Sequence, residues 1–171
     1  MNQEVFIQNL TELSNVLHLL RESNSDVLEV GECAAECLVN GGKILFCGNG
    51  GSAADSQHLA AELTGRFIKD RRPLAAMALS TDTSALTCIS NDYSFDEVFA
   101  RQLSGLGRMG DLLIGISTSG NSRNVIRAVE EAQKLGMKTV GLLGRDGGKL
   151  RSLCDHTIVV PSKVTARIQE C

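Results

Sequence analysis

Residues 43–66 limit the possible fold more than any other stretch of the sequence. Residues 43–47 form a short, mostly apolar segment, and the sequence of residues 48–52 is Gly-Asn-Gly-Gly-Ser. Residues 53–66 have the composition of a helix. Three of the four residues 48–51 are glycine, which allows a sharp turn and a close approach of the backbone to a ligand. We expect Ser52 to cap the following helix, whose free N–H groups would form an anion site. The stretch therefore predicts a strand, a ligand-binding glycine loop and a helix.

The same alternation of apolar strand and helix continues to the end of the chain. The predicted strands cover residues 43–47, 75–79, 111–116, 138–143 and 156–160. Helices are predicted over residues 53–66, 84–90, 96–103 and 125–135, with a short one from 149 and another from 165. This pattern is typical of one α/β domain over residues 1–171, with a parallel sheet covered by helices on both faces. Ligands of such sheets bind at the carboxyl ends of the strands, where loops 48–52 and 117–122 are expected.

Residues 1–40 predict a helical hairpin in front of the first strand. Ser23, Asn24 and Ser25 are expected to break the helix, and Gly41 to end its second half. The apolar residues of the first half follow the a/d spacing of helix-on-helix packing: Phe6, Leu10, Leu13, Leu17 and Leu20. We interpret the hairpin as a subunit-packing element. The alternative is a helix pair that covers one face of its own sheet.

Charge and composition argue against several classes of function. The net charge is −3, aromatic residues make up 4% and Trp is absent, whereas nucleic-acid binding needs a basic face and stacking aromatics. No apolar run approaches the roughly 20 residues that span a bilayer, and the N-terminal residues lack the pattern of a signal peptide. We therefore expect a cytoplasmic protein with no nucleic-acid or membrane partner. The six cysteines include no Cys-x-x-Cys pair, so we expect reduced thiols, with Cys33, Cys37 and Cys47 in the core.

The helix after the glycine loop carries a stripe of polar residues. At about 100° per residue, Asp55, His58, Glu62 and Arg66 fall on one side of a helix that is otherwise expected to be largely buried. His58 and Glu62 are four positions apart, so the pair could bind a metal ion, or Glu62 could act as a general base. A bare pair of this kind is more often only structural.

The sequence Ser-Thr-Ser-Gly-Asn-Ser at residues 117–122 predicts a phosphate site. Its hydroxyls and the N-terminus of the next helix suit a phosphate monoester. The chain contains no Gly-x-x-x-x-Gly-Lys-Ser/Thr, which argues against a P-loop nucleotide site. Residues 48–53 fit a relaxed dinucleotide fingerprint, but the acidic residue expected after the next strand is missing, and Asp82 comes too late. The remaining alternative is an ordinary helix cap.

Taken in order, these motifs resemble those of the bacterial phosphoheptose isomerases, which are sugar isomerase (SIS) domain proteins. The resemblance covers essentially the whole chain. It rests on loop 48–52, the segments 57–66 and 117–122, the pair Asn91-Asp92 and the segment 167–170. It implies a flavodoxin-like three-layer fold, a homotetramer with sites between subunits, and one zinc ion per subunit. The implied reaction converts sedoheptulose 7-phosphate to D-glycero-D-manno-heptose 7-phosphate through an enediol, toward activated heptose for surface polysaccharide.

The resemblance also implies roles for particular residues. The expected substrate contacts are Asn49, Gly50, Gly51, Ser52, Glu62, Arg66, Asn91, Asp92, Ser117, Thr118, Ser119, Ser122 and Gln169. The expected zinc ligands are His58, Glu62 and Gln169, and Glu62 is the expected base. The family supplies a further His on the C-terminal helix as a ligand and acid/base. This sequence stops at Cys171, before such a position, and we expect the natural protein to continue.

Two alternative hypotheses assign the protein to other functional classes. A non-catalytic SIS tetramer could bind a protein partner, as the initiator-associating regulators of replication do. Such proteins typically lack the helix glutamate, so Glu62 favours the enzyme. A phosphosugar-sensing domain is the third hypothesis, but we expect no attached DNA-binding or effector domain.

Overall fold

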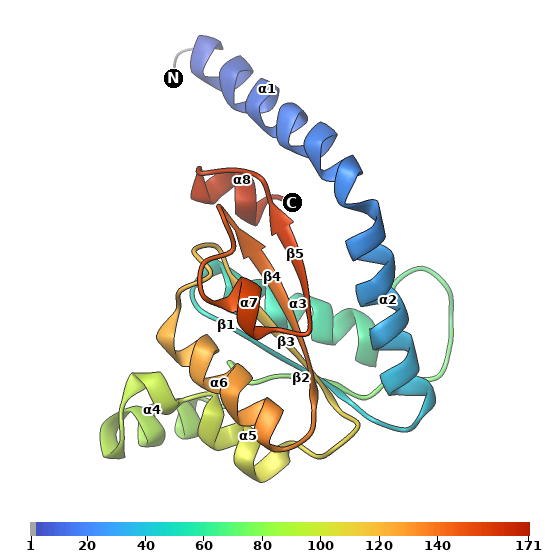
Figure 1. Cartoon of the computed structure of the whole chain (residues 1–171), viewed down its shortest axis with the longest axis vertical. Coiled ribbons are helices and arrows are strands. Elements are labelled where there is room, and N and C mark those ends of the chain that lie inside the picture. Colours follow the sequence, from blue (N-terminus) through green and yellow to red (C-terminus); the bar gives the residue numbers. More distant parts are fainter. Residues whose placement is uncertain (1–2) are drawn as a thin grey trace.

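A five-stranded parallel sheet organises the molecule, with helices against both of its faces (Figure 1). The computed structural model describes residues 3–171. The strands are β1 Ile44–Gly48, β2 Ala76–Ala78, β3 Leu112–Ser117, β4 Lys138–Gly144 and β5 His156–Val160. Their order in the sheet is β2-β1-β3-β4-β5, and all pairs are parallel. This is the flavodoxin-like order, so the predicted fold class is confirmed.

The helices lie close to their predicted positions. They are α1 Gln3–Leu20, α2 Asn24–Val39, α3 Gly51–Thr64, α4 Thr83–Asp92, α5 Ala100–Leu106, α6 Arg123–Lys134, α7 Leu150–Leu153 and α8 Thr165–Gln169. Two 3₁₀ turns, η1 Arg21–Ser23 and η2 Phe95–Glu97, complete the set. The helix predicted over 96–103 is split into η2 and α5. None of the helices formed by residues 3–171 is both long and apolar enough to cross a membrane.

β1 and β3 are buried along their whole length, and their side chains alternate between two cores. Leu45 and Cys47 of β1 pack with α5, α6 and α7 on one face. Ile44 and Phe46 pack with α2 and α3 on the other. Each fully buried side chain of this size contributes about 1.5–3 kcal/mol. The two cores hold β1 and β3 rigidly, and the loops that leave these strands carry most of the predicted site.

The prediction of a helical hairpin at the N-terminus is wrong. The α1 and α2 helices follow one another with only the η1 turn between them, and they form one long bent arm (Figure 1). Leu20 and Asn24 both keep right-handed helical φ and ψ angles at the junction. The η1 turn between the two helices contains no Gly or Pro. Ser23 and Asn24 can be part of a tight helical turn, so the chain bends at η1 without reversing its direction.

The cysteines behave as the sequence predicted. All six are free. Cys37 and Cys47 are buried, one in each core, and Cys33 packs against the core that contains Cys37. Burial raises the pKa of Cys154 to about 12, assisted by the charge of Asp155. Such thiols are inert at neutral pH and act as small apolar side chains.

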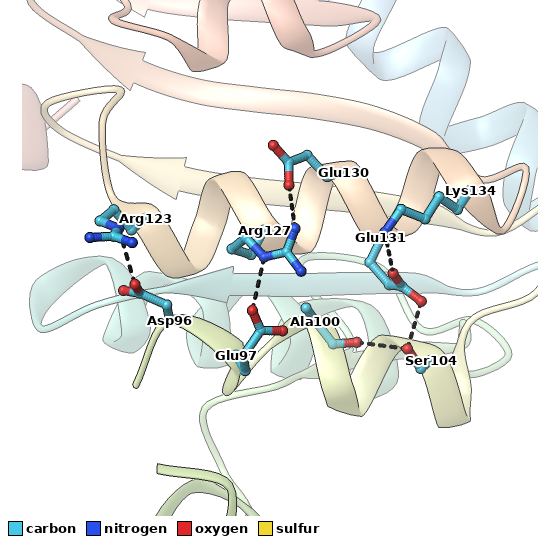
Figure 2. A network of polar contacts seen from close by, with 9 residues as sticks. All are labelled: Asp96, Glu97, Ala100, Ser104, Arg123, Arg127, Glu130, Glu131 and Lys134. Atoms are coloured by element: carbon cyan, nitrogen blue, oxygen red, sulfur yellow. Dashed lines mark hydrogen bonds and ion pairs between the residues drawn. The ribbon is translucent and has the colours of Figure 1, made fainter. Parts of the chain in front are cut away.

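A row of polar contacts fixes α6 against η2 and α5 (Figure 2). Arg127 bridges Glu97 through Nε at 2.9 Å and Glu130 through Nη1 at 2.6 Å. Arg123 pairs with Asp96 at 3.0 Å, and the Ser104 hydroxyl donates to Glu131 Oε1 at 2.6 Å. These contacts support α6, whose N-terminus follows the serine-rich loop.

Candidate functional site

The glycine loop turns directly from β1 into α3. Gly50 has φ +56°, a left-handed value that residues with a Cβ rarely adopt. Its carbonyl accepts from Ala53 N at 3.1 Å and Ala54 N at 3.2 Å, so α3 begins at Gly51. The predicted cap by Ser52 is therefore wrong, because the helix starts one residue earlier and Gly50 occupies the cap position. Ser52 is instead buried in the first turn of α3.

The serine-rich loop gathers its hydroxyls at the end of β3. Ser117 Oγ lies 2.9 Å from Ser122 Oγ and 3.5 Å from Ser119 Oγ. Ser122 occupies the N-cap position of α6, yet its side chain makes no capping hydrogen bond. The hydroxyls therefore face one another instead of the helix end, which argues against the simple helix-cap interpretation.

The position of Gly120 fixes the shape of this loop. Its φ is +64°, and a Cβ at this position would lie 1.9 Å from the carbonyl oxygen of Gly147. The loop after β4 thus packs directly on the serine-rich loop, and Asn121 Oδ1 accepts from Lys149 N at 3.1 Å. Beside them lies a cleft of about 790 Å³, lined by Ser119, Asn121, Arg145, Asp146, Pro161, Ser162 and Lys163.

A pair of amides joins the glycine loop to the serine-rich loop. Asn49 and Asn124 exchange two hydrogen bonds of 2.8 Å each, from Nδ2 to Oδ1 in both directions. Asn124 lies in the first turn of α6, just after the serine-rich loop, and is buried. The pair spans the point between β1 and β3 where the strand order reverses, which is the usual ligand position in such sheets. Sequence reasoning did not single out Asn124.

The C-terminal helix α8 brings Gln169 to the glycine loop. Ser52 Oγ donates to Gln169 Oε1 at 3.3 Å, and Gln169 Nε2 donates to the carboxylate of Asp55. A Cβ on Gly51 would lie 3.0 Å from the same Oε1. Burial raises the pKa of Asp55, and the nearby His58 opposes this effect. The stripe on α3 pointed to Asp55, but sequence reasoning gave it no role; here it orients Gln169.

His58 and Glu62 lie together on α3, as predicted. His58 Nε2 is 3.9 Å from Glu62 Oε1, and the side chains are 72% and 31% exposed. The face of α3 that carries Gln57, His58 and Ala61 is exposed, so the expectation of a largely buried helix is wrong. This face has no neighbouring element to cover it within the described chain.

The residues present fit a zinc ion only in part. His58 and Glu62 offer one imidazole nitrogen and one carboxylate, both suitable donors. The amide of Gln169 is engaged by Asp55 and Ser52. Among residues 3–171, no three His, Cys, Asp or Glu side chains are grouped so that they could hold a metal ion. A structural or catalytic zinc normally has at least three protein ligands, so further donors are needed beyond this pair.

Three predicted substrate contacts lie apart from the two loops. Arg66 follows the end of α3 at Thr64 and is exposed, so it does not share the helical stripe. Asn91 and Asp92 are exposed at the end of α4. Asn91 Nδ2 donates to Asp92 Oδ1 at 2.9 Å, and Cys88 Sγ donates to Asp92 Oδ2 at 3.5 Å. Their roles with substrate stay predictions.

Comparison with known proteins gives consistent results. The model of the SIS domain family matches residues 6–144. The phosphoheptose isomerase of Aliarcobacter butzleri (strain RM4018) is 56% identical over 165 residues, which cover 96% of this chain and 86% of the relative. That of a Nitratiruptor species is 67% identical over 135 residues, covering 79% of this chain and 72% of the relative.

Solved structures show the same similarity. Phosphoheptose isomerase GmhA from Neisseria gonorrhoeae superimposes with a TM-score of 0.93 at 49% identity, covering 98% of this chain and 90% of that one. A phosphoheptose isomerase from Francisella tularensis gives a TM-score of 0.94 at 36% identity, with coverages of 99% and 92%.

Proposed function

The chain belongs to the SIS domain family, and within it to the phosphoheptose isomerases, and from this premise we propose that it converts sedoheptulose 7-phosphate to D-glycero-D-manno-heptose 7-phosphate. The observation that carries the proposal is the joining of the two loops by Asn49 and Asn124 at the point where the strand order reverses. One loop offers hydroxyls for a phosphate, and the other offers glycine backbone for a sugar. A single phosphosugar can contact both.

In this proposal the serine-rich loop anchors the phosphate and the glycine loop guides the sugar. Ser117, Ser119 and Ser122 supply hydroxyl donors, and the first turn of α6 adds free backbone N–H groups. These contacts are shared by substrate and transition state, so they contribute chiefly to binding. They also fix the carbon chain relative to α3.

Glu62 is the base of the proposed reaction. It takes the proton from the hydroxyl-bearing carbon beside the carbonyl, and the carbonyl oxygen gains a proton to give the enediol. The carbon proton, or one from solvent, then returns to the former carbonyl carbon, while the hydroxyl on the first carbon loses its proton to form the aldehyde. Glu62 lies almost three helical turns after Ser52 on α3, about 15 Å along the axis. Its side chain leans back toward the helix N-terminus. A sugar phosphate anchored at the loops must therefore lie extended to present its carbonyl end to Glu62, which suits a seven-carbon chain.

A zinc ion is a further part of the proposal. His58 and Glu62 would each supply one ligand, and additional donors would come from beyond this pair. When bound, the cation would polarise the two oxygens of the enediol. Calorimetric titration of metal-free protein with zinc, compared with a His58→Ala variant, tests this. Equal affinity of the two proteins would contradict the ligand role of His58.

We also propose a homotetramer in the cytoplasm. The exposed apolar side chains of α1, Phe6, Leu10 and Leu17 among them, support association of subunits. The six free thiols are in keeping with a reducing compartment.

The function is tested by proton NMR of the purified protein with sedoheptulose 7-phosphate in D₂O. We expect the aldose product to appear, with deuterium incorporated where the proton exchanges with solvent. Glu62→Gln should lower kcat by about a hundred- to ten-thousandfold, the usual span for loss of a general base. Glu22→Gln, on the exposed η1 turn, is the matched control and should retain full activity. Near-normal turnover by Glu62→Gln would remove Glu62 from the role of base.

A further inference from the structure

Three consecutive residues of α8 contact three different parts of the molecule. Arg167 reaches the backbone of α1, Ile168 packs against Val16 of α1 and the ends of β4 and β5, and Gln169 meets the glycine loop. Figure 1 shows α8 at the tips of β4 and β5, beside α1. A helix of five residues has almost no stability of its own. Its position, and that of Gln169, must therefore be set by its neighbours.

Arg167 makes the polar contact that ties α8 to the N-terminal arm. Its side chain is buried, and Nη1 donates to the carbonyl oxygen of Asn9 at 2.7 Å. The same nitrogen lies 3.1 Å from Glu170 Oε2. Its Nε is buried and has no hydrogen-bond partner among residues 3–171. Around it, Ile168 packs with Val16 of α1 and Val160 of β5.

Stabilisation of the fold alone does not explain why an arginine is buried at position 167. Burying a guanidinium with one unpaired N–H costs free energy, and apolar replacements of buried charged groups are often neutral or stabilising. Asn9 lies inside α1, so its carbonyl also belongs to the hydrogen-bond ladder of that helix. Glu170 is exposed and can be solvated. Removing the guanidinium would thus leave no buried group without a partner.

A directional contact is what an apolar side chain cannot replace. Ile168 packs on Val16 and Val160 and closely against Gly144, but such apolar packing has no preferred direction and does not by itself fix the rotation of α8. The bond from Arg167 to Asn9 has a fixed direction and length. It sets the rotation and height of α8, and hence where Gln169 meets Ser52 and Asp55.

We propose that Arg167 is a positioning residue for the isomerase site, which holds α8 on α1 so that Gln169 is correctly placed at the glycine loop. The proposal rests on the function proposed above and on the place of Gln169 in that site. It links the arm that carries the assembly surface to the geometry of the site. Arg167 itself touches no substrate.

The test is a double-mutant cycle with Arg167→Met and Gln169→Ala in the full chain. Arg167→Met should lower kcat/KM by about ten- to a hundredfold, because misplacement by about 1 Å can cost that much. In the Gln169→Ala background the same change should cost less than about twofold, since both act through one group. Arg167→Lys, which keeps one donor, should recover part of the loss. Additive effects in the cycle would overturn the proposal.

Stability measurements separate positioning from a purely structural role. Arg167→Met should shift Tm by less than about 4 °C, which corresponds to roughly 1 kcal/mol in a chain of this size. Arg151→Met is the matched control, because Arg151 also donates to a backbone carbonyl, that of Asp146, but lies exposed on α7. It should change neither kcat/KM nor Tm. A large fall in Tm that accounts for the lost activity of Arg167→Met would overturn the proposal.

Hydrogen exchange gives a readout that does not depend on activity. The amides of Ile168 and Glu170 donate to Val164 and Ala166 within α8. Both should exchange faster in Arg167→Met, while amides of β1 and β3 keep their protection. Unchanged protection of α8 would overturn the proposal even if the enzyme is active. Absence of turnover by the wild-type protein would instead count against the proposed function. The exchange measurement would still decide whether Arg167 holds α8 on α1.

Discussion

Ser122 shows how the same residue can satisfy a sequence rule and yet serve another purpose. Its position at the start of α6 is that of an N-cap, where Ser is favoured. The side chain makes no capping bond, and its hydroxyl faces Ser117 instead. A hydroxyl kept away from the helix end is free to face a ligand. Because a binding role and a capping role predict different effects of mutation, an experiment can distinguish them.

Ser122→Ala should weaken phosphate binding with little effect on stability. Loss of a hydrogen bond to a charged group costs about 1.5–3 kcal/mol, so KM should rise about ten- to a hundredfold. Because no cap is removed, the free energy of unfolding should change by less than about 1 kcal/mol. Steady-state kinetics and urea unfolding of the same preparation measure both quantities.

Asp82→Ala provides the opposite case as a control. Asp82 is a true cap, since its Oδ1 accepts from Ala85 N at 2.9 Å at the start of α4. Its replacement should cost about 1 kcal/mol of stability and leave KM unchanged. If Ser122→Ala instead behaved like Asp82→Ala, the serine-rich loop would be only a helix cap.

At the level of single elements, the sequence predicted the strands better than the joints between helices. An apolar run between turn residues marks β5 at its observed bounds, His156–Val160, because burial on both faces leaves few alternatives. The junction of α1 and α2 has no such constraint. Ser and Asn favour a break but do not determine whether the chain reverses or bends, and here it bends.

The sequence likewise predicted some parts of the candidate site and missed others. The glycine loop and the serine-rich loop are local motifs, and both were predicted from adjacent residues. The bonds from Asn49 to Asn124 and from Gln169 to Asp55 join residues 75 and 114 positions apart. Amide and carboxylate side chains pair in many arrangements, so no local pattern indicates such contacts. Only the topology of the sheet brings them together.

The hydrogen bond between Ser104 of α5 and Glu131 of α6 predicts how the stability of the protein depends on pH. The hydroxyl of Ser104 holds the pKa of Glu131 below its ordinary value; burial opposes this, and Lys134 adds to it (Figure 2). A carboxyl whose pKa is lower in the folded state stabilises the protein above its ordinary pKa. That contribution is lost as the pH falls through the lowered value.

Ser104→Ala should therefore destabilise the protein by about 1 kcal/mol at pH 7, and the difference from wild type should shrink in acid. Urea unfolding at a series of pH values measures the difference, and NMR of the Glu131 carboxyl carbon measures the pKa. Ser152→Ala is the control, because Ser152 donates to the backbone carbonyl of Lys149 and to no carboxylate. A difference for Ser104→Ala that stays constant with pH would show that the hydroxyl does not act through the Glu131 charge.

On the scale of the whole molecule, the arm formed by α1 and α2 leaves much apolar surface uncovered. Val16 is buried and Leu20 packs beside it, so one side of α1 is occupied by its own chain. Of the predicted a/d residues, Phe6, Leu10 and Leu17 are 60%, 51% and 49% exposed. Val5, Ile7 and Leu19 are also exposed. Burying such side chains is worth about 1.5–3 kcal/mol each, which favours packing against another subunit.

We predict that charges on this face prevent assembly without unfolding the chain. Leu10→Glu combined with Leu17→Glu places two carboxylates where a partner helix would lie, and burying unpaired charge is not tolerated there. Both positions are exposed in the single chain, so its Tm should fall only by the amount that assembly contributes. Light scattering should show a tetramer for the wild type and smaller species for the variant.

The matched control introduces the same charge on the polar side of the same helix. Thr11 and Asn15 are exposed and lie off the a/d seam, so Thr11→Glu with Asn15→Glu should stay tetrameric. Loss of assembly should also lower isomerase activity, since Arg167 connects α1 to the helix that carries Gln169. A monomeric wild type would refute the proposed tetramer. A Leu10→Glu, Leu17→Glu variant that remained tetrameric would show that subunits meet elsewhere, because no seam of this kind accommodates two buried carboxylates.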